Sequence, residues 1–185
     1  MGRLLYSAAM SLDGFIAGPG GDMQWLTRFM GGEPDGAAAA LPAKVGALLI
    51  GRRTWGGDDP NRGDAEKEGA FGGTWHGPQF VVTHDPPAED EPEVTFETDL
   101  ARAIAAAREA AGDRYVCVLG AEVARGCLEL GELDEVLVYV EPIMLGDGVR
   151  LFDHPGGAEV GLERLDVEVG PSATHLWFRV ADADG

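Results

Sequence analysis

Residues 47–55 read ALLIGRRTW, and this stretch decides the fold class. The apolar run Ala47–Ile50 stops at Gly51, and two arginines, a threonine and a tryptophan follow at once. A short apolar run that ends at a turn residue is typical of a buried strand. Polar residues just after such a strand lie at its carboxyl end, where open α/β sheets bind their ligands. The stretch therefore predicts an α/β protein with a ligand site beyond Gly51.

Similar apolar runs recur on both sides of this stretch and predict about eight strands in all. Their expected bounds are Arg3–Ser11, Val45–Gly51, Gln79–Thr83, Val94–Thr98, Tyr115–Leu119, Glu135–Pro142, Leu162–Val169 and Thr174–Ala181. Strands that alternate with helices favour a largely parallel sheet. Only the residues GPSA separate the last two runs, so these two strands are expected to form an antiparallel hairpin at an edge.

Helices are expected between several of the strands. The sequence TDLARAIAAAREAAGD, residues 98–113, has a capping Thr or Asp at its start, an apolar stripe and a glycine at its end. Shorter helices are predicted at 121–131 and 37–44. Residues 84–93 form a polar, proline-rich surface link, and residues 56–77 an irregular, glycine-rich segment. A segment as long as the latter is either functional or disordered.

Composition restricts the classes of function. The chain of 185 residues fits a single domain, and 14 Lys and Arg stand against 32 Asp and Glu, a net charge of −18. Such an acidic chain argues against nucleic acid and anionic membranes as partners. The sequence shows no apolar run of transmembrane length and no signal peptide, and its two cysteines suit buried thiols, so we expect a cytoplasmic protein. The spacing of Cys and His predicts no metal site.

Three stretches have the character of ligand sites. Beyond Gly51, the forks of Arg52 and Arg53 suit a phosphate, although two solvated surface arginines would look the same. In VCVLGAEVARGCL, residues 116–128, a buried strand runs into Gly120 and a helix, as in any strand–turn–helix unit; neither G-x-G-x-x-G nor G-K-[ST] is present. The glycine-rich SLDGFIAGPGGDMQW, residues 11–25, is either a lid over a ligand or a plain turn.

Five motifs, in this order, resemble the dihydrofolate-reductase superfamily over nearly the whole chain. They are SLDGFIAG at 11–18, IGRRTW at 50–55, FVVTHDPP at 80–87, VLGAEVARGCLELGELDEV at 118–136 and VEPIMLGDGVRLF at 140–152. The chain most resembles the branch that contains the C-terminal reductase domain of the riboflavin-biosynthesis deaminase-reductase. The resemblance implies a mostly parallel, twisted eight-stranded sheet with flanking helices and an antiparallel C-terminal edge hairpin, and a bound NADPH.

The resemblance also implies which residues meet NADPH. The segment Gly51, Arg52, Arg53 and Thr54 would meet the 2′-phosphate and pyrophosphate, and Thr83 and His84 would border the adenosine phosphate. The turn that holds the pyrophosphate would comprise Leu119, Gly120, Ala121, Glu122 and Val123. Backbone groups of Ala9 and Ile16 would anchor the nicotinamide. Relatives often have two glycines in the pyrophosphate turn, and Leu119 replaces the first of them here.

The substrate implied by the resemblance is a small heterocycle, like that of 5-amino-6-(5-phosphoribosylamino)uracil reductase. Dihydrofolate reductases carry an acid soon after the tryptophan that matches Trp25, and none occurs here before Gly32, which argues against folate. A divergent dihydrofolate reductase that uses a displaced acid such as Asp22 stays open, as does an NADPH-binding module without turnover. A pocket lined by polar groups would favour the enzyme. A pocket filled by Trp75, Phe71 or Phe80 would favour the module.

Four residues are candidates for the substrate side of the site. Asp13 is the candidate proton donor, unless it only hydrogen-bonds its own turn before Gly14. Asp22 and Trp25 are candidates for the pocket, although Trp25 also suits core packing. Glu141, at the end of a strand, faces either the pocket or solvent.

The C-terminal hairpin is also the expected interface of a homodimer. Its apolar residues alternate along the last strand, at Leu176, Phe178 and Val180. Relatives of this branch commonly pair through the sheet edge, although such a face could instead pack into the chain's own core.

Overall fold

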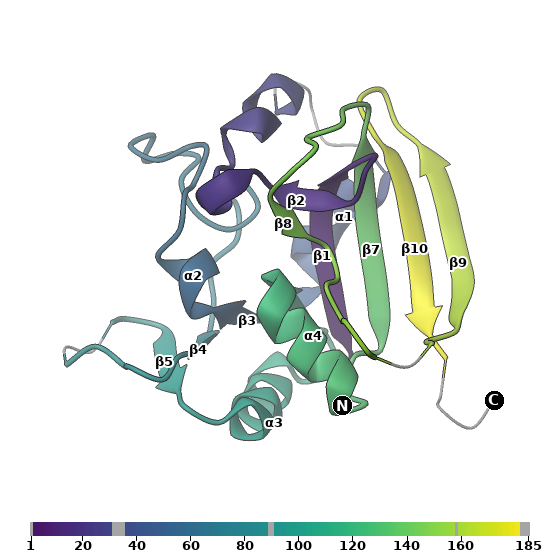
Figure 1. The fold of residues 1–185 in the computed structure, drawn as a ribbon. Coiled ribbons are helices and arrows are strands. Elements are labelled where there is room, and N and C mark those ends of the chain that lie inside the picture. The colour runs from purple at the N-terminus through teal and green to yellow at the C-terminus, as the bar shows by residue number, and fades with distance from the viewer. Residues whose placement is uncertain (1, 31–35, 89–90, 158, 182–185) are drawn as a thin grey trace.

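A computed structural model of the chain describes residues 2–30, 36–88, 91–157 and 159–181. An eight-stranded sheet with the order β5-β4-β3-β6-β1-β7-β10-β9 forms its centre (Figure 1). The bounds are β1 Leu4–Ser11, β3 Val45–Gly51, β4 Gln79–Val82, β5 Val94–Glu97, β6 Tyr115–Leu119, β7 Glu135–Glu141, β9 Leu162–Val169 and β10 Thr174–Val180. All eight predicted strands are therefore confirmed, with bounds that differ by at most one residue at an end.

The six strands from β5 to β7 run parallel, and the C-terminal hairpin closes the sheet as predicted. β10 pairs antiparallel with β7 and with β9, so β9 is an edge strand. A second sheet of two short strands, β2 at Phe15–Ala17 and β8 at Val149–Arg150, was not predicted. Strands of three and two residues are too short to show an apolar period, and only the fold brings them together.

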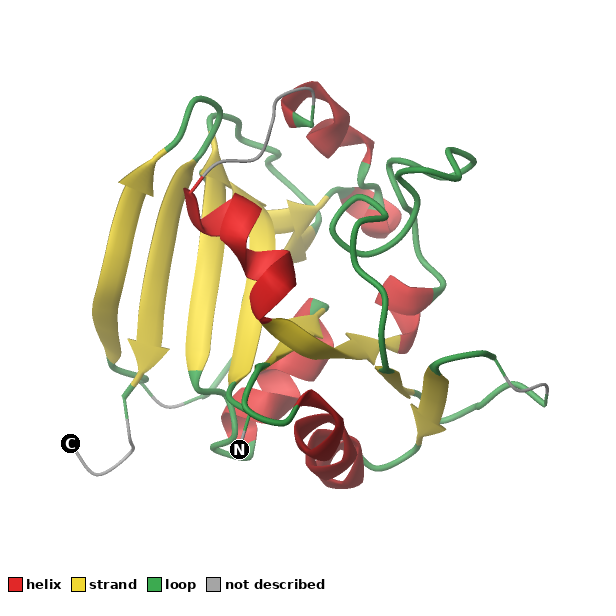
Figure 2. Ribbon diagram, turned by 180° about the vertical axis from the view of Figure 1, so that it is seen from behind, coloured by secondary structure: helices red, strands yellow, loops and turns green. Residues whose placement is uncertain are grey.

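Helices cover both faces of the parallel part of the sheet. α3 (Leu100–Ala111) and α4 (Ala121–Glu129) lie on one face, and α1 (Gly36–Lys44) lies on the other (Figures 1 and 2). α3 begins as predicted, because the Asp99 side chain accepts a hydrogen bond from the Arg102 backbone N–H at 2.8 Å. Neighbouring residues of β1 enter opposite cores: Leu4 packs on the α3/α4 side and Leu5 on the α1 side.

Three short helices were not predicted as such. They are α2 (Arg52–Trp55) and the 3₁₀ helices η1 (Pro19–Gly21) and η2 (Gln24–Phe29). Each lasts at most six residues, which is too short for a helical apolar stripe to be read from the sequence.

The segment 56–77 is irregular, as expected, and it packs onto the body of the protein. The Trp75 indole N–H donates to the Val45 carbonyl at 3.2 Å, and Phe71 and Trp75 pack against the α1-side core. Asp58 accepts hydrogen bonds from the Met23 backbone N–H and the Gln24 side chain. The long segment therefore covers the start of β3 and also supports η2.

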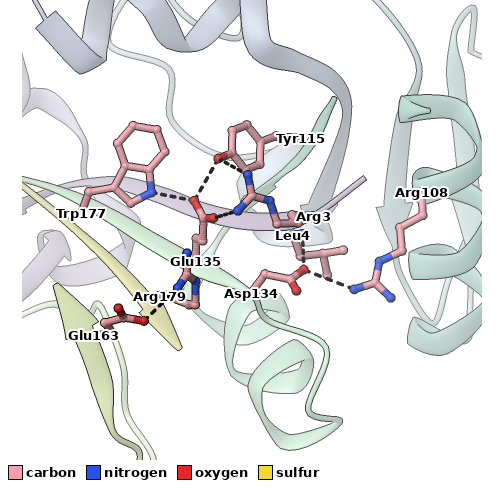
Figure 3. A network of polar contacts seen from close by, with 9 residues as sticks. All are labelled: Arg3, Leu4, Arg108, Tyr115, Asp134, Glu135, Glu163, Trp177 and Arg179. Atoms are coloured by element: carbon pink, nitrogen blue, oxygen red, sulfur yellow. Dashed lines mark hydrogen bonds and ion pairs between the residues drawn. The ribbon is translucent and has the colours of Figure 1, made fainter. Parts of the chain in front are cut away.

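A polar network fastens the amino end of β1 to its neighbours (Figure 3). Glu135, the first residue of β7, is buried and accepts hydrogen bonds from Arg3, from the Tyr115 hydroxyl at 3.0 Å and from the Trp177 indole at 2.8 Å. Close by, Asp134 accepts from the Leu4 backbone N–H at 2.7 Å and from Arg108 at 3.3 Å. Five separate elements, β1, β6, β7, β10 and α3, are joined here, at the amino edge of the parallel strands.

The edge strand β9 leaves apolar side chains in contact with solvent. Leu162, Leu165, Val167 and Val169 are all exposed, and Val169 is 81% exposed. No described helix lies over β9 in either view (Figures 1 and 2). On β10, Leu176, Phe178 and Val180 are half-buried, and Val180 packs against the chain's own core. The open apolar surface of the hairpin therefore lies mainly on β9.

Candidate functional site

The carboxyl ends of β3 and β6 lie side by side and form the centre of the candidate site. The two parallel strands pair up to Ile50 and Leu119. The connection that leaves β3 runs to β4, whereas the one that leaves β6 crosses β1 to reach β7, on the other side. Connections that depart in opposite directions leave a crevice, and such switch points are the ligand sites of open α/β sheets. The fold thus joins the predicted segments 51–54 and 119–123.

The two turns approach each other so closely that Gly120 cannot carry a side chain. A Cβ on Gly120 would lie 2.4 Å from the Thr54 hydroxyl oxygen, and its φ of +105° also favours glycine. A Cβ on Gly51 would lie 3.2 Å from Val123. Gly120 is the N-cap of α4, and no side chain caps it, so the first N–H groups of this helix are available at the edge. This cradle of backbone fits a pyrophosphate group.

The predicted cations lie at the rim of the cradle. The Arg52 guanidinium lies over the Trp55 ring, 5.1 Å from its centre. Arg53 forms an ion pair with Glu122 of α4, in which both side chains are largely exposed. An anion that binds here would therefore compete with Glu122 for Arg53. The structure brings Arg53 and Glu122 together, and this acid weakens the positive charge of the site.

Thr83 and His84 lie one strand further along the same edge, at the end of β4. The Thr83 backbone N–H donates to Glu97, and its hydroxyl accepts from the Asp85 backbone N–H at 3.2 Å. Thr83 is buried and shapes its own turn, whereas His84 is exposed. Of this pair, His84 is thus the residue that a ligand along the edge could contact.

Ala9 lies in the part of β1 that extends beyond the end of its neighbour β6. The Arg3 carbonyl accepts a hydrogen bond from the Val116 N–H of β6, and the Leu4 carbonyl accepts one from the Asp134 N–H, just before β7. The backbone N–H and C=O groups of the odd-numbered residues of β1 therefore point towards β6. Among the described strands, pairing between β1 and β6 stops at Tyr6, whereas β1 and β7 pair up to Ser11. The N–H and C=O of Ala9 therefore face the space beyond β6, which suits an amide group. Ile16 lies on β2, which packs against β1.

Asp13 anchors one loop to another. Its Oδ1 accepts from the Ser11 hydroxyl at 2.6 Å and the Leu145 backbone N–H at 3.0 Å, and its Oδ2 accepts from the Gly146 N–H at 2.7 Å. The pKa of Asp13 is lowered to about 2, mainly by the hydrogen bond from the Ser11 hydroxyl. The hydrogen bonds from the Leu145 and Gly146 backbone N–H groups lower the pKa further. The proton needed by a general acid is therefore scarce on Asp13 at neutral pH, and its visible role is to hold the loop 142–148.

Asp22 and Trp25 have local partners in the turn and short helix that follow β2. The Asp22 carboxylate accepts from the Gln24 backbone N–H at 2.8 Å. Trp25 is buried and packs edge-to-face on Phe29, with ring centres 6.3 Å apart. Its indole N–H has no hydrogen-bond partner within the described part of the chain. Neither residue lines the cavity at the carboxyl end of β7.

Glu141 does line that cavity, and its side chain is buried rather than solvated. The cavity has a volume of about 290 Å³, and Glu141, the last residue of β7, is 5% exposed. Burial raises the pKa of Glu141, and the nearby His175 opposes this rise. The side-chain oxygen Oε2 has no hydrogen-bond partner among the described residues. Of the four candidates on the substrate side, Glu141 is therefore the one that the structure places in a cavity.

Sequence reasoning missed other residues of this region. Ser11 is fully buried next to Glu141 in the register of β1 and β7. Leu12 is 67% exposed and lines the cavity, and His175 of β10 is buried and near enough to Glu141 to influence its pKa. A polar residue within an apolar strand, as at Ser11 and His175, is the only signal that the sequence offers. It does not show which neighbours the strand will have.

The described residues offer no metal-binding group of three or more His, Cys, Asp or Glu. Both cysteines are buried, and burial raises the pKa of each thiol to about 12. In the described part of the chain, no helix has the length and apolar character needed to cross a membrane.

Comparison with known proteins places these features in context. The family model of the RibD C-terminal domain matches residues 3–176. The uncharacterised Bacillus subtilis protein YwjB is 28% identical over 148 residues, which cover 78% of this chain and 79% of that protein. The crystal structure of a 'putative riboflavin biosynthesis protein' from Shewanella sp. PV-4 superposes with a TM-score of 0.77 at 24% identity, over 97% of this chain and 99% of that one.

A second solved structure is larger than this chain. The diaminohydroxyphosphoribosylaminopyrimidine deaminase/5-amino-6-(5-phosphoribosylamino)uracil reductase of Thermotoga maritima superposes with a TM-score of 0.64 at 19% identity. The match covers 97% of this chain and 57% of that protein. These structural likenesses confirm the predicted fold.

Proposed function

The chain belongs to the RibD C-terminal domain family, and from this premise we propose that it is an NADPH-dependent reductase of a small heterocyclic substrate. This family is a reductase domain of riboflavin biosynthesis, and 5-amino-6-(5-phosphoribosylamino)uracil reductase is the activity nearest to the proposal. The observation that carries the proposal is the contact of Gly120 with Thr54 at the switch point. Among the residues that the structure describes, this is the place where two turns, an uncapped helix N-terminus and two arginines meet at the carboxyl edge.

Different residues at this edge would bind different parts of the proposed cofactor. The cradle at Gly51 and Gly120 would hold the pyrophosphate, and Arg52 and Arg53 would hold the 2′-phosphate. The open backbone of Ala9 would fix the nicotinamide amide. When bound, NADPH would supply the hydride, and the chain's own part would be to hold the substrate beside it and exclude water.

The cavity beside Glu141 supports an enzyme rather than a module that only binds nucleotide. Polar side chains of Glu141, Ser172 and Thr174 line the cavity. The aromatic residues that would have argued for the module lie elsewhere. Trp75 is bonded to the amino end of β3, and Phe80 belongs to the core under α3 and α4. These positions leave the pocket open for a substrate.

Phe71 and Asp22 support neither of the alternative functions. Phe71 packs against the α1-side core. The Asp22 carboxylate is engaged with the Gln24 backbone. The proposal of a divergent dihydrofolate reductase that uses Asp22 therefore gains no support from the geometry.

Calorimetric titration with NADPH and with NADH tests the proposal. We expect NADPH to bind more tightly, because only NADPH carries the phosphate that the two arginines would hold. The variant Arg52→Ala/Arg53→Ala should lose this preference, by about 1–3 kcal/mol, the usual range for charge-assisted hydrogen bonds. Substrates are then screened through NADPH oxidation. If neither nucleotide binds to the wild-type protein, the proposed function is wrong.

A further inference from the structure

Asp13 lies just beyond the point where β1 and β7 leave the sheet side by side. The two parallel strands pair up to the last residue of each. Beyond them, the Leu12 backbone N–H donates to the Ile143 carbonyl at 2.8 Å. The Asp13 carboxylate then accepts the backbone N–H groups of Leu145 and Gly146, one on each oxygen. The chain that follows β1 is therefore held to the chain that follows β7.

The same carboxylate also fixes the start of β2, through the buried hydroxyl of Ser11. This hydroxyl donates its only proton to Asp13 Oδ1 at 2.6 Å. The hydroxyl oxygen is thereby oriented so that a lone pair accepts the Phe15 backbone N–H at 3.0 Å. Phe15 is the first residue of β2. Asp13 therefore positions two segments at once, residues 143–146 directly and β2 through Ser11.

The two segments meet again a few residues further on, where β2 pairs antiparallel with β8. Gly148 lies so close to the Ala17 carbonyl that a Cβ at position 148 would overlap with it. Residues 11–17 and 142–151, the paired loops, thus form one unit. Asp13 joins the two halves of this unit at the end nearest the sheet.

The paired loops lie against the part of β1 that carries the proposed nicotinamide anchor. β2 packs against β1, and Figure 1 shows β2 and β8 crossing in front of the carboxyl half of β1. The backbone groups of Ala9 that face the space beyond β6 belong to this half. A shift of the paired loops would therefore move the protein surface next to Ala9.

We propose that Asp13 is a positioning residue for the nicotinamide end of the proposed cofactor, and that it acts through the paired loops rather than by contact with the cofactor. The proposal rests on the proposed reductase function and adds a residue to it. Both oxygens of Asp13 accept hydrogen bonds within the paired loops, which makes the effect indirect. The phosphates of the cofactor would lie at the end of β3, which β6 separates from β1, so Asp13 should not affect their binding.

Calorimetric titration of the full chain with two ligands tests this role. NADPH carries the nicotinamide, whereas adenosine 2′,5′-bisphosphate carries only the adenosine end. Asp13→Asn replaces one acceptor oxygen by an amino group that cannot accept a backbone N–H. We expect this variant to weaken NADPH binding about fivefold or more and to leave binding of the bisphosphate within about twofold of the wild type. The matched control Asp147→Asn removes the same charge from an exposed position in the same loop and should bind both ligands like the wild type.

A second variant keeps Asp13 and removes its link to β2. Ser11→Ala deletes the hydroxyl between Asp13 and Phe15, so it should also weaken NADPH binding and leave the bisphosphate unaffected. Hydrogen exchange of the ligand-free protein tests the link itself. Asp13→Asn should speed exchange in residues 14–17 as well as in 142–148, whereas faster exchange in 142–148 alone would show that Asp13 does not hold β2.

The outcomes separate this inference from the proposed function. Equal losses of both ligands in Asp13→Asn would indicate a general loss of structure. That result, unchanged NADPH binding, or the same selective loss in Asp147→Asn would each overturn the role of Asp13 while the proposed function stands. Wild-type protein that binds neither ligand would reject the proposed function, and this inference with it.

Discussion

Gly120 and Thr54 meet across the ends of β6 and β3, 66 positions apart in the chain, so closely that a Cβ on Gly120 would lie 2.4 Å from the threonine oxygen. This contact joins the turn before α4 to the turn that carries the two arginines. It explains why glycine is required at position 120, and it sets the width of the cradle in which we place the pyrophosphate.

Gly120→Ala should therefore damage both stability and cofactor binding. The positive φ and the steric conflict together should cost about 2 kcal/mol or more, measured by chemical unfolding. NADPH affinity should fall at least tenfold in calorimetric titration. Gly131→Ala is the matched control, because Gly131 also has a positive φ but no atom within 4 Å of its would-be Cβ. It should lose some stability but no NADPH affinity; a similar loss of affinity would contradict the role of the cradle.

Glu122→Gln should tighten NADPH binding, because it releases Arg53 from its ion pair. The pair is exposed, so its contribution is at most about 1 kcal/mol, and we expect a two- to fivefold gain in affinity. Glu129→Gln removes the same charge from the other end of α4 and should have no comparable effect. Unchanged or weaker NADPH binding in Glu122→Gln would show that Arg53 does not meet the cofactor.

Asp13→Asn should change how stability depends on pH in acid. The folded state holds the pKa of Asp13 at about 2, below its ordinary value of 3.8, so its carboxylate stabilises the fold above about pH 4. This contribution is lost as the pH falls from about 4 to 2. The variant should lack the corresponding part of the acid dependence in thermal unfolding followed from pH 7 to pH 2. Asp147→Asn, in the same loop, serves as control, and an identical profile in both variants would refute the role of Asp13.

Glu135→Ala should destabilise the protein without weakening cofactor binding. It leaves Arg3, Tyr115 and Trp177 without their common acceptor, at a cost of about 2–3 kcal/mol in chemical unfolding. NADPH affinity should not change, since Glu135 lies at the opposite edge of the sheet. Glu163→Ala removes an exposed partner of Arg179 and should cost less than about 1 kcal/mol (Figure 3). Equal losses of stability in the two variants would show that the buried network contributes no more than an exposed ion pair.

We also propose that two copies pair through β9, whose exposed Leu162, Val167 and Val169 form an apolar edge. Sedimentation should show a dimer, and Val167→Glu should shift it towards the monomer, because a charge would then have to be buried in the interface. Leu130→Glu, at an exposed apolar position beyond α4, should leave the dimer intact. A wild-type monomer at micromolar concentration would contradict the proposal.

The elements that could be predicted are those whose signal is local. Each buried strand shows as an apolar run that ends at a turn residue, and α3 shows its cap, stripe and terminal glycine within sixteen residues. β2 and β8 escaped prediction because three and two residues carry no period. The same limit applies to the site: the residues after β3 and β6 follow from the strand ends, but the Arg53–Glu122 pair does not.

By itself, the sequence determined the eight strands, their largely parallel arrangement and the carboxyl-end segments from which the proposed cofactor site is built, because these depend on local pattern and chain direction. The tertiary structure alone decided what Asp13, Glu135 and Glu141 do. Asp13 anchors a loop 132 positions away. Glu135 accepts hydrogen bonds from side chains on three other strands or at their ends. Glu141 lines a cavity between β7 and the last hairpin. The physical reason is that alternation along a strand sets the face of a side chain, whereas only the order of strands in the sheet sets its neighbours.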